Sequence, residues 1–147
     1  MASGTVSGIK VNPLGSTVIS EKTELSFTFR PVHQLPVESE VEIEIPKGPD
    51  ESFTIDDDDK CTLLGPYKNT VSRPKSCVIR DQVLTIRNLF GSRQLAEGSV
   101  VQFGIGGVTN PFSVHDVGVF KIRTYEVHGD KRYLVDSVTR GGLYSAT

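Results

Sequence analysis

The sequence has no tryptophan, one methionine at position 1 and two cysteines among its 147 residues. It contains no CxxC motif, so a thioredoxin-type or zinc role for the cysteines is not expected. Lysines and arginines are scattered, and the formal net charge is −2. Because nucleic-acid binding needs a concentrated basic face, we expect no nucleic-acid partner. The apolar runs are too short to span a bilayer, so we expect no direct membrane insertion.

Catalytic and cofactor-binding motifs are also missing. The sequence has no HExxH, GxSxG or GxGxxG pattern, and no two of His33, His115 and His128 share a metal-like spacing. We therefore expect surface histidines, no cofactor other than a calcium ion considered below, and no enzymatic activity.

The abundant feature is strict alternation of apolar and polar residues. In Glu40–Ile45 three apolar side chains share one face and three glutamates share the other. This period of two indicates an antiparallel sheet with one wet face, and it excludes a helix. The pattern recurs in Val6–Val11, Thr23–Arg30, Cys77–Arg80, Val83–Arg87, Ser99–Ile105, Val117–Val127 and Tyr133–Val138.

Turn residues separate these segments at short intervals. Asp81-Gln82 suggests a hairpin or a bulged continuation, His128–Lys131 is a good hairpin signal, and Gly106-Gly107 suggests a corner or a bulge. We predict an all-β domain covering residues 1–147, expected to be a fragment of a larger multidomain protein. The predicted fold is an immunoglobulin-like antiparallel β-sandwich of eight or nine strands with Greek-key crossings, and the alternative is a partly open β-barrel.

The two cysteines enclose a turn-rich segment. Between Cys61 and Cys77 the chain contains Gly65-Pro66, Asn69 and Pro74, which we interpret as a long excursion between strands. A bridge across a loop of this size would stabilise the fold by about 3 kcal/mol in the chain-entropy model. We expect a disulfide, and two free buried thiols are the alternative.

The run Asp56, Asp57, Asp58 and Asp59 is the strongest local charge feature. It would supply carboxylate oxygens to a calcium ion, but it lacks the DxDxDG pattern of a calcium loop. A solvated acidic loop is the favoured interpretation, and a calcium site is the alternative.

Three stretches resemble one family. They are Gly8–Pro13, then Leu35-Pro36 leading to Val41–Pro46, and Phe103–Pro111 followed by Gly118–Thr124. Their order is similar to that of the Ig-like β-sandwich repeats of large surface proteins of ciliates and other microbial eukaryotes. The resemblance implies an extracellular structural or adhesive role, and it transfers no catalytic residue.

These observations predict a non-catalytic structural or adhesive module of an extracellular or cell-surface protein. Its expected partners are neighbouring domains or surface and matrix proteins, which loops or an exposed edge strand would contact. The alternative is a module that binds calcium or carbohydrate, with Asp56–Asp59 as the leading calcium site.

Overall fold

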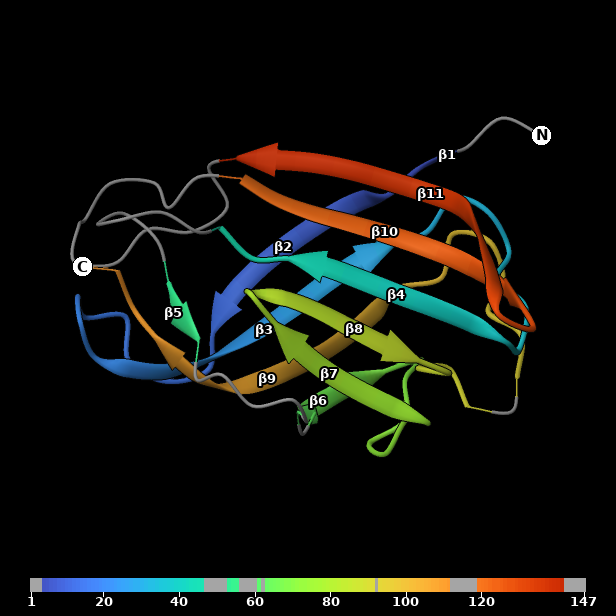
Figure 1. The fold of residues 1–147 in the computed structure, drawn as a ribbon. Coiled ribbons are helices and arrows are strands. Elements are labelled where there is room, and N and C mark those ends of the chain that lie inside the picture. Colours follow the sequence, from blue (N-terminus) through green and yellow to red (C-terminus); the bar gives the residue numbers. More distant parts are fainter. Residues whose placement is uncertain are drawn as a thin grey trace.

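The computed structural model describes residues 4–46, 53–55, 61, 63–91, 93–111 and 119–141. In these ranges the chain forms strands arranged in two layers (Figure 1). The described residues include no helix with the length and apolarity that crossing a membrane requires.

The first sheet has six strands in the order β1-β11-β10-β4-β8-β7. These strands are β1 (Gly4–Thr5), β4 (Ser39–Glu44), β7 (Ser76–Arg80), β8 (Val83–Arg87), β10 (Val119–His128) and β11 (Lys131–Gly141). The second sheet has five strands in the order β2-β3-β9-β5, and β6 also pairs with β9. Its strands are β2 (Ser7–Pro13), β3 (Lys22–Arg30), β5 (Thr54–Ile55), β6 (Leu63–Lys68) and β9 (Val101–Thr109).

The predicted β-sandwich is confirmed. The sheets stack face to face and do not close into a barrel. Nine of the described strands have five or more residues, which agrees with the expected eight or nine, and β1 and β5 have two residues each. The order places β4 between β8 and β10, so the chain crosses repeatedly between the layers. All pairs are antiparallel except β1, which runs parallel to β11.

One strand lies where we expected only turns. Leu63–Lys68 forms β6, which pairs with β9 through Leu63–Ile105 and Leu64–Gly104. Within β6 only Leu63 is buried, so the strand shows no alternation of apolar and polar residues. Backbone pairing to β9, and not a hydrophobic pattern, therefore defines this strand.

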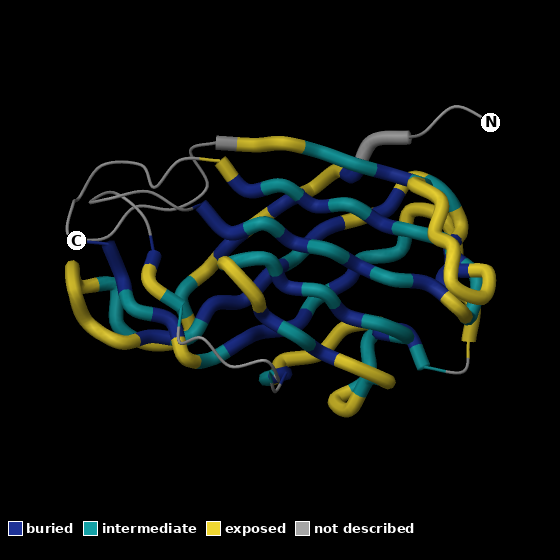
Figure 2. The backbone as a smooth tube through the Cα atoms, in the orientation of Figure 1, coloured by how far each residue is buried: buried dark blue, intermediate teal, exposed yellow. Residues whose placement is uncertain are grey.

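The core lies between the sheets, and along strands such as β4 and β8 its buried residues alternate with partly buried ones (Figure 2). Phe27 of β3 contacts Phe103 of β9 in its own sheet, with ring centroids 5.8 Å apart. It also contacts Phe120 of β10 in the facing sheet at 6.2 Å. Phe120 in turn contacts Phe53 at 6.0 Å. These four rings have at most 2% of their surface exposed and join the two layers.

The predicted turns and bulge are present. Asp81 and Gln82 form a two-residue hairpin turn with positive φ angles of 51° and 62°. The Gln82 carbonyl accepts a hydrogen bond from the Ile45 amide (2.9 Å), and its side chain donates to Pro46 (2.7 Å). On β9 an extra residue at Gly106–Gly107 shifts the register against β3, and Gly107 adopts a φ of 70° that favours glycine.

Candidate functional site

The disulfide predicted from the sequence is present between Cys61 and Cys77. Their Cα atoms lie 5.1 Å apart, inside the usual range for a bridge. Cys77 belongs to β7 in the first sheet, whereas Cys61 directly precedes β6 in the second sheet. The Cys61 amide also donates a 3.0 Å hydrogen bond to the Cys77 carbonyl. The bridge therefore ties the two layers together at the margin of the sandwich.

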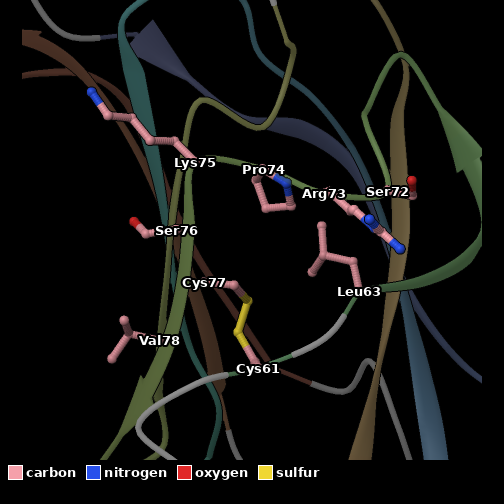
Figure 3. Close-up of a pocket in the computed structure, with 9 residues that line it drawn as sticks. All are labelled: Cys61, Leu63, Ser72, Arg73, Pro74, Lys75, Ser76, Cys77 and Val78. Atoms are coloured by element: carbon pink, nitrogen blue, oxygen red, sulfur yellow. A yellow bond between two sulfur atoms is a disulfide. The ribbon is translucent and has the colours of Figure 1, made fainter.

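A pocket of about 580 Å³, which we call the disulfide pocket, opens beside this bridge (Figure 3). It lies between β7, the start of β6 and the segment that connects them. Its lining residues are Cys61, Leu63, Ser72, Arg73, Pro74, Lys75, Ser76, Cys77 and Val78. The disulfide, Leu63 and Pro74 form an apolar wall. The connecting segment supplies the Ser72 hydroxyl and the cations Arg73 and Lys75.

The charge of the disulfide pocket has a single sign. Arg73 and Lys75 are exposed, and none of the lining residues carries a carboxylate. Neither side chain forms an ion pair within the described ranges. The pocket thus combines an apolar wall with two cations that are free to contact a ligand.

A second pocket of about 480 Å³, which we call the His33 pocket, lies beside the β10–β11 hairpin. Its lining residues are His33, Gln34, Glu97, Glu126, Tyr133, Leu134 and Val135. Two of these residues are carboxylates, none is a lysine or arginine, and Tyr133 is 53% exposed. This pocket therefore has the opposite charge character to the disulfide pocket.

Asp136 of β11 is fully buried beneath the His33 pocket. Its carboxylate accepts a 2.9 Å hydrogen bond from the His33 amide and lies 2.7 Å from His33 Nδ1. The Asp136 amide donates to the Thr124 hydroxyl at 3.0 Å. The buried carboxylate therefore has partners on both oxygens, and it fixes the β3–β4 connection to β11.

The sequence interpretation missed this pair and treated His33 as a surface histidine. The side chain is 36% exposed, but its ring is held by a buried carboxylate 103 positions away. One signal was available, because Asp136 occupies a strand position with the same phase as apolar residues. A histidine paired with a carboxylate is a general-base arrangement. However, the residues that line the pocket include no serine, threonine or cysteine to act as a nucleophile.

Charged residues on the outer face of the first sheet compensate one another. Arg123 of β10 donates to Glu42 (2.8 Å) and Glu44 (3.0 Å) of β4. Arg132 of β11 donates to Glu40 (2.6 Å) and Glu42 (3.1 Å). The hydrogen bond from Arg123 lowers the pKa of Glu44 below its usual 4.5. The glutamates predicted to face water are thus covered by Arg123 and Arg132.

The tyrosines of the last hairpin do not form a cluster. Tyr125 is opposite Leu134, and Tyr133 is opposite Glu126. The Arg132 guanidinium lies 4.2 Å from the centre of the Tyr125 ring, whereas Tyr133 contacts the ring of His128. Burial raises the pKa of Tyr125, and the negative charge of Glu42 contributes to the increase.

The remaining candidate residues do not form a site in the described structure. Asp56, Asp57, Asp58 and Asp59 lie outside the described residues, as does His115, so the calcium site remains a prediction. His128 is exposed and pairs with Glu126 at 2.8 Å. Among the residues that the structure describes, no three histidine, cysteine or acidic side chains gather as a metal site would require.

Sequence comparisons find no match, either to a protein family or to a curated protein. Among solved structures the chain is similar to BslA, a bacterial hydrophobin, with 15% identity, 93% of this chain and 97% of that chain covered, and a TM-score of 0.46. It is similar to the exo-β-N-acetylglucosaminidase of Vibrio harveyi, with 15% identity and a TM-score of 0.45. That match covers 87% of this chain and 17% of the enzyme. It is also similar to the collagen-binding domain of a Staphylococcus aureus adhesin, with 8% identity, 90% and 95% coverage and a TM-score of 0.41.

Proposed function

We propose that this domain is a non-catalytic structural or adhesive module of an extracellular or cell-surface protein. The observation that carries the proposal is the Cys61–Cys77 disulfide that joins the two sheets. Disulfides persist in oxidising compartments, so a bridge that links the layers suits a secreted or surface domain. The sandwich gives the module a stiff body, and its pockets and edge strands offer contacts to neighbouring domains or matrix proteins.

The test is made on the natural protein in its own cells. Intact cells are treated with an impermeant biotin reagent, and the recovered protein is alkylated before and after reduction and weighed. We expect surface labelling, with alkylation of Cys61 and Cys77 only after reduction. Free alkylation of both thiols without reduction, together with labelling only in lysed cells, would contradict the proposal.

The claim that the domain is not an enzyme is tested at the His33–Asp136 pair. The purified domain and an H33A variant are compared on chromogenic ester, phosphate and glycoside substrates. We expect no turnover above background with either protein. Turnover by the wild-type domain that H33A lacks would show an enzyme and overturn this part of the proposal.

A carbohydrate-binding module is the second candidate, because exposed Tyr133 borders the polar His33 pocket. An aromatic face beside hydrogen-bonding side chains suits a sugar ring. Affinity electrophoresis in gels containing polysaccharides tests this candidate, with Y133A as the variant and Y67A, which removes another exposed tyrosine, as the control. Retardation that Y133A loses and Y67A keeps would support it, and no retardation would exclude it for the sugars used.

A further inference from the structure

The cations of the disulfide pocket differ from Arg123 and Arg132 of the first sheet. Arg123 and Arg132 are paired with glutamates across neighbouring strands. Arg73 and Lys75 have no such partner in the described part of the chain, and the lining of their pocket is free of carboxylates. Two neighbouring cations with no counter-charge among the described residues complement a ligand that carries carboxylates.

The wall of the disulfide pocket is apolar. The sulfur atoms of Cys61 and Cys77 lie beside Leu63 and Pro74, and Figure 3 shows these groups gathered around the same opening. A pocket of about 580 Å³ is large enough for one or two apolar side chains. The complementary ligand therefore carries apolar groups as well as acidic ones.

We infer that the disulfide pocket is the contact site for an acidic, extended polypeptide segment of a partner protein. Acidic side chains of the segment pair with Arg73 and Lys75, and apolar side chains between them contact the disulfide and Leu63. An anionic polysaccharide would match the cations but not the apolar wall. This inference rests on the proposed adhesive function and names its partner class.

The test uses fluorescence anisotropy with the oxidised domain and three short labelled peptides of equal length. In one peptide glutamate alternates with valine, in the second glutamine replaces every glutamate, and in the third lysine replaces it. We expect the acidic peptide to bind at least about tenfold more tightly than the glutamine peptide, because each charged hydrogen bond is stronger than a neutral one. The lysine peptide should not bind, and added salt should weaken binding of the acidic peptide.

The variants localise the site. R73E/K75E should reduce binding of the acidic peptide at least about tenfold. K10E/K131E changes the net charge by the same amount at two exposed lysines outside the pocket, so it should bind as the wild type does. Equal melting temperatures, and thiols that resist alkylation in both variants, would show that the fold and disulfide are intact.

Three results would overturn the inference. These are equal binding of the acidic and glutamine peptides, equal loss in R73E/K75E and K10E/K131E, and binding of a heparin oligosaccharide at Arg73 and Lys75 with no binding of the acidic peptide. None of them bears on surface labelling or on the redox state of the cysteines. A failure of this inference is therefore distinguishable from a failure of the proposed function.

Discussion

The disulfide pocket and the His33 pocket both lie where a connecting segment is fixed to a strand, but the links differ. At the disulfide pocket a covalent bond joins Cys61 to β7. At the His33 pocket hydrogen bonds from His33 to the buried Asp136 carboxylate join the β3–β4 connection to β11. The covalent link needs no buried charge, and the cations beside it have no ion-pair partner among the described residues. The polar link needs a carboxylate that is fully satisfied inside the protein.

The largest expected effect comes from removing the covalent link. C61S/C77S should lower the free energy of unfolding by about 3 kcal/mol, because the unfolded chain regains the entropy of an open loop. The melting temperature should fall by roughly 10 °C for a chain of this size. Urea unfolding measures the first quantity and a thermal melt the second, each with and without reductant.

The variant itself provides the control for this experiment. Reductant should destabilise the wild type to the level of C61S/C77S and leave the variant unchanged. Identical urea midpoints for oxidised wild type and variant would show that the bridge does not stabilise the fold, and the contrast between the two links would fail.

An intermediate effect is expected from the polar link. D136A should cost about 2 kcal/mol, because it removes a buried acceptor and leaves the His33 amide without its partner. H33A should cost less, since the Asp136 carboxylate keeps space for water at the pocket. Chemical denaturation of H33A, D136A and the double variant gives the coupling energy between the two residues.

D130N, at an exposed aspartate in the β10–β11 turn, is the matched control and should be neutral. Strict additivity of H33A and D136A would mean that the observed contact contributes nothing to stability. In that case the His33 pocket would depend on the surrounding strands alone.

The smallest loss of stability is expected at the partly exposed ion pairs of the first sheet. Comparing it with the loss in D136A tests whether burial makes the His33–Asp136 contact stronger. R123Q should cost about 0.5–1 kcal/mol at neutral pH, as is usual for partly exposed pairs. Because the folded pKa of Glu44 lies below 4.5, its contribution is present above about pH 4.5 and is lost as the pH falls through the folded value. The stability difference between wild type and R123Q should therefore shrink in acid.

K10Q removes an exposed cation from another strand. It is the control that shows how much stability changes when one positive charge is lost without an ion pair. A loss in R123Q as large as that in D136A would show that burial is not what separates the two kinds of polar contact.

The alternating segments could be predicted because period two reports directly which face of a strand is buried. Glu40–Ile45 and Thr23–Arg30 became β4 and β3 with shifts of one residue at their ends. Gly106-Gly107 was predicted as a corner or a bulge, and the structure shows a bulge there. β6 was missed because its exposed residues and Gly65-Pro66 give no alternation, and only β9 determines that it is a strand.

The sequence by itself determined that this protein is an all-β domain, because apolar alternation is a local property of the chain. It also supplied the two cysteines, whose separation fits a bridge. The tertiary structure decided which groups meet across the fold. It brought His33 to Asp136 across 103 positions, and it brought Leu63 of the second sheet to the pocket beside Cys77 of the first. Such contacts depend on which strands become neighbours, and strand pairing over long separations leaves no local pattern in the sequence.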